Sequence, residues 1–378
     1  MNIKKESDMI KNHIYRYPCL ATCSIIIAAF MGLGASATDE RKMANSNEPV
    51  ISFITLSQTN SSLKTGLTAK TYYSVLVDNK NTKWFLTELG IVSFSDDKWT
   101  LHNENNKIGS SGLKDFAYRY NPGGSEFWVV SPGGATVTTL PFDDKTEAIT
   151  YNAEEGSILS NNVVKISFGN GSLRWFGTDK GIAAFSDNKW LALTYDDNYP
   201  SAMFQEFPIT SIATNPAGDS LYVGTDGAGV ARVYRNDVDA ISGASVYAQW
   251  GPIILPSDKI FSIYITPDGT KWFGTDQGVA SHSGNNTLEN WTVYTTDEGL
   301  VNNFVQAITA DKEGNLWFGT KGGGISVFDG NKWTSYTTDN GLNSNNILCL
   351  TVDNEGVVWI GTDDGVVYFK GGNFISYR

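Results

Sequence analysis

The sequence predicts an all-β protein, a seven-bladed β-propeller with four antiparallel strands in each blade. Two observations predict it: the string Trp-Phe-Gly-Thr and its variants recur seven times, and short runs rich in Val, Ile, Thr and aromatic residues surround each copy. Neighbouring copies are 42 to 50 residues apart and begin at Trp84, Trp128, Trp175, Tyr222, Trp272, Trp317 and Trp359. A near-constant period of this length indicates one supersecondary unit that buries its faces only against its neighbours.

Each unit contains four β-type runs separated by clusters of Asp, Asn and Gly, which is the chemistry of strands and turns. We name the strands A to D from the propeller axis outward, and the Trp-Phe-Gly-Thr string is strand B. The repeated tryptophans are expected to pack between blades. Strands A are expected to include Tyr73–Asp78, Val163–Phe168, Ile260–Ile265 and Ile347–Val352, and the last strand D is Phe374–Tyr377.

The chain divides into three predicted parts. Residues 1–37 have the layout of a secretory signal peptide, because basic residues precede the apolar run Cys19–Leu33 and the small residues Ala35–Ala37 follow it. That run is shorter than the roughly 20 residues of a membrane span. Residues 38–62 form a lead-in whose apolar stretch Ile51–Leu56 is a candidate ring-closing strand, and residues 63–378 form the propeller. The protein is therefore expected to be exported, to the periplasm or outside the cell, with no membrane span after signal cleavage.

Charge and cysteine content exclude several classes of function. The formal net charge is −12, and without residues 1–37 it becomes −14. Nucleic-acid binding needs clustered Lys and Arg, so nucleic acid is not an expected partner; the acidity favours solubility. Cys349 is the single cysteine outside the predicted signal peptide, which excludes a disulfide framework and predicts a buried, unreactive thiol.

Short catalytic and metal-binding motifs are absent from the sequence, which contains no P-loop, His-Glu-x-x-His, Gly-x-Ser-x-Gly or cysteine pair with metal spacing. His102 and His282 belong to distant repeats, so a shared acid–base role is not expected. No cofactor and no metal site are predicted. The many carboxylates still leave acid–base chemistry open, because a carboxylate pair needs no short motif.

The loops from strand B to strand C and from strand D to the next strand A lie on one face of a propeller, and a ligand site is expected there. The candidate polar residues are Asp179, Lys180, Asp226, Asp276, Gln277, Lys321, Asp363 and Asp364. Aromatic residues at the start of strand A would point to the mouth of the central channel or between blades: Tyr73, Phe116, Phe261 and Phe304. An aromatic floor surrounded by polar groups suits a sugar or another polar ligand; the alternative for each residue is turn capping or core packing.

The unit between Asp311 and Ile347 shows the repeat whole: Asp-x-x-Gly, Leu-Trp-Phe-Gly-Thr, Gly-Gly-Gly-Ile, Asn-Lys-Trp-Thr-Ser-Tyr and Asp-Asn-Gly-Leu-Asn-Ser-Asn-Asn-Ile. It resembles the two-component regulator propeller repeat. The resemblance covers about residues 63–378 and implies a periplasmic ligand-sensing propeller of the kind that recognises carbohydrate fragments. Such sensors continue into a membrane span, a kinase and a DNA-binding region, so the present sequence is expected to resemble the sensing part.

Three functions remain open from the sequence. The preferred one is an exported, non-catalytic module that binds a small polar ligand, such as a glycan, on the B–C loop face. The second is a secreted propeller enzyme, a lyase or glycan-cleaving protein that uses carboxylate or tyrosine chemistry. The third is a scaffold that holds an envelope protein.

Overall fold

The computed structural model describes residues 69–102, 112–121, 124–140, 142, 147–154, 158–193, 203–237, 240–247, 255–284 and 289–377. All of them belong to one compact unit, Ser61–Arg378. The predicted signal peptide, the lead-in and its stretch Ile51–Leu56 lie outside the described residues.

The described chain forms 28 strands in seven consecutive groups of four. The first three blades are β1 (Tyr72–Val77), β2 (Lys83–Thr87), β3 (Gly90–Ser95), β4 (Lys98–His102); β5 (Asp115–Asn121), β6 (Gly124–Ser131), β7 (Gly134–Thr138), β8 (Ile149–Tyr151); and β9 (Val163–Phe168), β10 (Arg174–Thr178), β11 (Gly181–Ser186), β12 (Lys189–Leu193). The fourth and fifth are β13 (Ile209–Thr214), β14 (Ser220–Thr225), β15 (Val230–Asp237), β16 (Ala240–Tyr247); and β17 (Ile260–Ile265), β18 (Lys271–Thr275), β19 (Val279–His282), β20 (Trp291–Tyr294). The last two are β21 (Val305–Ala310), β22 (Leu316–Thr320), β23 (Ile325–Phe328), β24 (Trp333–Tyr336); and β25 (Ile347–Val352), β26 (Val358–Thr362), β27 (Gly365–Lys370), β28 (Asn373–Tyr377).

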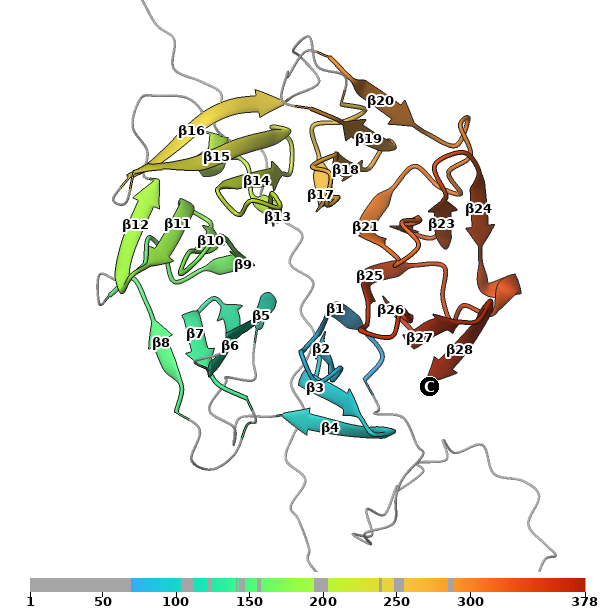
Figure 1. Ribbon diagram of the computed structural model, residues 1–378, viewed down its shortest axis with the longest axis horizontal. Coiled ribbons are helices and arrows are strands. Elements are labelled where there is room, and N and C mark those ends of the chain that lie inside the picture. Colours follow the sequence, from blue (N-terminus) through green and yellow to red (C-terminus); the bar gives the residue numbers. More distant parts are fainter. Residues whose placement is uncertain are drawn as a thin grey trace, which may run out of the picture. The chain divides into compact units, whose positions relative to one another are not determined.

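Each group is a separate antiparallel sheet in sequence order, and the blades follow one another around a ring with the last beside the first (Figure 1). This confirms the predicted seven-bladed propeller. The expected strands A were placed to within one residue. The helical segments among the described residues are short, α1 (Met203–Glu206) and a 3-10 helix at Thr338–Asn340. No described helix has the length and apolar character that crossing a membrane requires.

In the first, sixth and seventh blades the tryptophan of the repeated string is fixed by an acid of the preceding A–B turn. Asp311 accepts a hydrogen bond from the Trp317 indole at 2.9 Å, and Asp353 accepts one from Trp359 at 3.0 Å. The same carboxylates also accept backbone N–H groups of their own turn, as Asp353 does from Val357. One acid therefore closes the turn and satisfies a buried indole donor, which would otherwise be costly.

The threonine that ends the string closes the next turn. In six blades its hydroxyl donates to the carbonyl of the glycine that opens or directly precedes strand C, at 2.8–2.9 Å; the threonines are Thr87, Thr178, Thr225, Thr275, Thr320 and Thr362. These hydroxyls are buried, so the hydrogen bond fixes the start of each B–C loop.

The glycine of the string permits close packing of neighbouring blades near the axis. A Cβ at Gly319 would lie 2.5 Å from a methyl carbon of Ile347 in the next blade, and one at Gly224 would lie 2.6 Å from Ile260. Distances this short are not tolerated between carbon atoms, so strand B must carry glycine where the next strand A approaches it.

The first and last blades are joined by several contacts. The Cys349 thiol donates to the Tyr72 carbonyl at 3.2 Å, and burial raises the pKa of this thiol to about 12, as expected for a packing cysteine. A buried ion pair joins Lys83 to Asp353 at 2.9 Å. The sheet of the last blade contains β25–β28 in order, so the described ring is joined by side-chain and backbone contacts between two complete blades.

Gly319→Ala should lower the free energy of unfolding by about 1–3 kcal/mol, because the added methyl group has to displace Ile347. Chemical denaturation checks this. Gly133→Ala is the control, because its Cβ would meet nothing nearer than 3.4 Å and the loop is exposed. Equal effects of the two substitutions would contradict the close-packing explanation.

Lys83→Met should destabilise the ring by about 3 kcal/mol at neutral pH, since it leaves the buried Asp353 carboxylate without its cation. Burial alone would raise the pKa of Asp353, but hydrogen bonds from Trp359, Lys83 and two backbone N–H groups hold it below its usual value. A depressed folded-state pKa contributes stability above the unfolded value and loses it as the pH falls through the folded one. The difference in the free energy of unfolding between wild type and Lys83→Met should therefore become smaller below about pH 4.

Thermal unfolding of both proteins between pH 7 and about pH 3 tests this direction of the pH dependence. Lys370→Met is the matched control, because the Lys370–Glu355 pair is more than half exposed on both sides and should be worth little. A stability difference between wild type and Lys83→Met that grows on acidification would refute the stabilising role of the Lys83–Asp353 pair.

Candidate functional site

All seven strands A line a central cavity of about 210 Å³. One register layer supplies a residue from every blade, each opposite the third residue of a strand B string: Ser74, Asp115, Lys165, Ser211, Ser262, Ala307 and Cys349. The wall of the channel is therefore mostly small and polar, which leaves space along the axis.

Asp115 and Lys165 bring opposite charges to this layer from neighbouring blades. Asp115 accepts the backbone N–H of Ile166 at 3.2 Å. Burial raises the pKa of the Asp115 carboxyl, and the positive charge of Lys165 opposes that shift. The Ser211 hydroxyl in the same layer is buried and has no hydrogen-bond partner among the described residues, so the channel retains unused hydrogen-bonding capacity.

A β-bulge recurs at the second residue of strand A in six blades. The bulged residues are Tyr73, Val164, Thr210, Phe261, Gln306 and Leu348. A bulge leaves one residue unpaired and redirects its side chain. Because strand A begins on the B–C loop face, these side chains lie at that mouth of the channel, and Tyr73 and Phe261 line the cavity there.

The fifth and sixth blades place an aromatic pair at this mouth. The rings of Phe261 and Phe304 are 4.5 Å apart between centroids and inclined at 45°. The Lys321 ammonium lies 4.9 Å from the centroid of Phe304. Three of the predicted site residues are thus in contact, and they combine apolar ring surface with a cationic donor.

Amide side chains extend this cluster to the seventh blade. Gln306 donates to the Asn346 side chain at 2.9 Å, and Asn346 donates to Asp363 at 2.9 Å. Burial raises the pKa of Asp363, but hydrogen bonds from Ser344 and Asn346 outweigh it and keep the carboxyl below its usual value. Asp363 is therefore an anion at neutral pH, held next to the mouth.

Carboxylates form a rim around the mouth at the position that directly follows strand B. The residues at this position are Glu88, Asp179, Asp226, Asp276 and Asp363, with Lys321 as the basic member. Asp179 accepts from Asn162 at 3.2 Å, and Asp226 lies 3.9 Å from Lys259. One oxygen of Asp276 is buried without a hydrogen-bond partner in the described structure. Such a rim disfavours anions and offers acceptors to polar, uncharged groups.

The other predicted residues take different places. Lys180, Gln277 and Asp364 occupy the next turn position, where their backbone N–H groups donate to the strand B threonines at 3.0–3.1 Å. Their side chains are exposed on the loop face. Phe116 is buried between the first two blades, 5.8 Å from the ring of Phe127, so the structure gives it a packing position.

Sequence reasoning did not name Glu88, Gln306, Asp115 or Lys165 as site residues. Glu88 follows the variant string Trp-Phe-Leu-Thr, so aligning all repeats on the threonine would have identified it. Gln306 and Lys165 needed the position of the bulge and Asp115 needed the pairing register of β5, and no local sequence pattern gives either.

His102 and His282 lie in separate blades, as the repeat assignment implied. His102 is 2.9 Å from the Ser93 hydroxyl, and burial lowers the pKa of its imidazole to about 4. His282 stacks on Trp291 with 4.5 Å between ring centroids. The described part of the chain contains no cluster of three or more His, Cys, Asp or Glu side chains that could hold a metal ion.

The model of the two-component regulator propeller family matches residues 299–322 and 341–364. These segments contain Phe304, Lys321 and Asp363, and each runs from a D–A loop through strands A and B. No curated protein sequence matches the chain significantly.

Solved structures share the fold. The extracellular domain of a protein described as the hybrid two-component system BT3049 from B. thetaiotaomicron is 23% identical, with a TM-score of 0.66 over 83% of this chain and 40% of that one. The corresponding domain of BT4673 from the same organism is 19% identical, with a TM-score of 0.60 over 82% of this chain and 39% of that one. The chain thus spans about two fifths of these domains.

A virginiamycin B lyase from Staphylococcus aureus is 17% identical, with a TM-score of 0.56 over 80% of this chain and 96% of that one. At these identities the likeness concerns the fold, which unrelated functions share. The family matches are more specific: the segments that span strands A and B of the sixth and seventh blades are similar to the two-component regulator propeller, as the sequence resemblance indicated.

Proposed function

We propose that the protein is an exported binding module that holds a small polar, uncharged ligand, a glycan in the first instance, at the B–C loop mouth of its channel. The observation that carries this proposal is the aromatic pair Phe261–Phe304 set inside a rim of carboxylates. Support for export comes from the signal-peptide layout of residues 1–37 and from the likeness of the fold to extracellular domains of hybrid two-component systems.

The chemistry of the mouth favours a sugar over other ligands. Sugar rings present apolar C–H faces, which pack on aromatic rings, and hydroxyl groups, which donate to carboxylates and accept from amines. The Phe pair supplies the first surface, Asp276 supplies an unused acceptor and Lys321 a donor. An anionic ligand would meet the repulsion of Asp276 and Asp363.

A thermal-shift and calorimetry screen of the full chain against neutral oligosaccharides tests the proposal. At least one oligosaccharide should raise the midpoint of thermal unfolding, and the effect should saturate with its concentration. Phe304→Ala and Asp276→Asn should each weaken its affinity by about tenfold or more, because one removes ring surface and the other the acceptor charge (about 1.4 kcal/mol).

Asp97→Asn is the matched control for charge, because Asp97 is exposed in a C–D turn on the opposite face and has a positive φ of 56°, which Asn accepts. It should bind like wild type. A cooperative melt with no shift from any oligosaccharide, together with a stable complex with an envelope protein, would replace the proposal with the scaffold function.

A further inference from the structure

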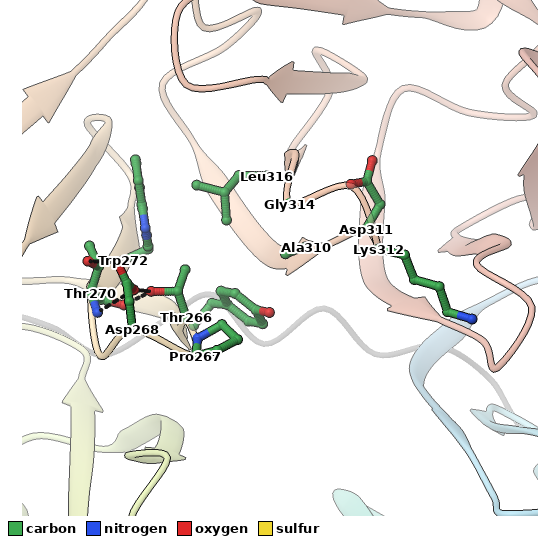
Figure 2. Close-up of a pocket in the computed structure, with 11 residues that line it drawn as sticks. Thr266, Pro267, Asp268, Thr270, Trp272, Ala310, Asp311, Lys312, Gly314 and Leu316 are labelled. Carbon is green, nitrogen blue, oxygen red and sulfur yellow. Dashed lines mark hydrogen bonds between the residues drawn. The ribbon is translucent and has the colours of Figure 1, made fainter.

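A groove opens between the fifth and sixth blades on the face opposite the channel mouth, where the A–B turns lie. Its volume is about 490 Å³, and Tyr264, Trp272, Pro267, Ala310 and Leu316 supply its apolar lining. Figure 2 shows Trp272 on one wall, Leu316 across from it, and Thr266 and Asp268 at the near turn. None of these residues belongs to the proposed glycan site.

The groove lies where one blade lacks the acid that fixes its tryptophan. In the sixth and seventh blades, an Asp six residues before the tryptophan accepts from the indole N–H. In the fifth blade that position is Thr266, whose hydroxyl donates to Asp268 and to the Thr270 carbonyl. No described residue accepts a hydrogen bond from the Trp272 indole N–H, although the Trp272 side chain is only 6% exposed.

The neighbouring blade enlarges the gap. At the junction of the seventh and first blades, the space beside the tryptophan holds the ion pair of Asp353 and Lys83. At the junction of the fifth and sixth blades, the residues in the same register are Thr266 and Leu316, so a charged pair is replaced by a shorter polar and an apolar side chain. The volume that the Asp353–Lys83 ion pair occupies at the junction of the seventh and first blades is open at the junction of the fifth and sixth blades.

Loss of the acid alone does not create such a groove. Trp175 in the third blade also lacks it, since Gly169 stands six residues earlier, and its indole N–H has no partner in the described structure. However, Trp175 is completely buried in the core cluster between the third and fourth blades. Trp272 differs because its unpartnered donor borders an open groove.

Each charged group around the groove makes a hydrogen bond within the protein. Asp268 accepts from the Thr270 N–H at 3.1 Å and hydroxyl at 3.2 Å, and Asp311 accepts from Asn315 at 2.8 Å and from Trp317. The Lys312 ammonium donates to the Asn354 carbonyl. Two carboxylates against one ammonium group leave the lining net negative, which disfavours an anion. The apolar lining and the indole donor are the features that favour a neutral ligand.

We propose that this groove binds a small neutral molecule that has an apolar body and one carbonyl or ether oxygen, and that this oxygen accepts the Trp272 indole N–H. The volume lies in the ordinary range for small-molecule sites, about 300–1,000 Å³. The apolar body packs against Tyr264 and Leu316, and the oxygen takes the place that a carboxylate oxygen holds in the sixth and seventh blades.

Fluorine NMR titration of the full chain with para-fluoroacetophenone tests this assignment. Wild type should bind the probe saturably, and para-fluorobenzoate and fluorobenzene, which add a negative charge or lack the acceptor, should bind at least fivefold more weakly. Thr266→Asp restores the acid of the neighbouring blades, so it should occupy the indole N–H and weaken probe binding at least tenfold. Thr334→Asp, on the exposed strand β24, is the charge-matched control and should bind like wild type.

Trp272→Phe is the second variant, because it keeps an aromatic ring and removes the N–H donor. It should also weaken probe binding, so the proposal can be tested even if Thr266→Asp does not fold. Unchanged affinity in both variants, or binding of benzoate as tight as that of the ketone, would overturn the proposal. So would concentration-dependent dimerisation that Thr266→Asp abolishes without any probe binding, since the occupant would then be a second copy of the chain.

Discussion

The close approach of each strand A to strand B of the preceding blade is the constraint on which the ring depends. At Gly319 and Gly361 a single added carbon would collide with the next blade. The missing Cβ lets blades meet near the axis, and each strand A that follows a glycine-bearing blade bulges at its second residue, whose side chain lies at the channel mouth. The Phe261 and Gln306 side chains at the candidate site are consequences of this packing.

The first and second blades show what happens where the glycine is absent. Their strings carry Leu86 and Val130 at this position. Strand β5, which follows the Leu86 blade, pairs in register without the bulge, whereas β9, which follows the Val130 blade, keeps it. Phe116, near the start of β5, is buried against Phe127 instead of facing the mouth. In these two blades larger side chains provide the interblade packing at this position, and the aromatic pair of the site, Phe261 and Phe304, comes from blades that keep the glycine.

Most of the fold could be predicted from the sequence because the residues of the Trp-Phe-Gly-Thr string and of the turns recur at the same positions of each repeat. The period gave the number of blades, and turn residues placed strands such as Val163–Phe168 correctly. The site could be predicted less well, because its members depend on the bulge and on which strand faces which. Lys321 and Phe304 lie seventeen residues apart, and only the pairing of β21 with β22 brings them into contact.

The opposite faces of the ring differ because the residues that close their turns differ. On the B–C face, threonine closes the turn through its hydroxyl, so the acid that follows it is free to form the rim. On the A–B face, the acid itself closes the turn and fixes the tryptophan, as Asp311 does. A substitution after the threonine therefore changes the rim and spares the core. In the fifth blade Thr266 takes the place of the A–B acid, and it borders the groove between the fifth and sixth blades.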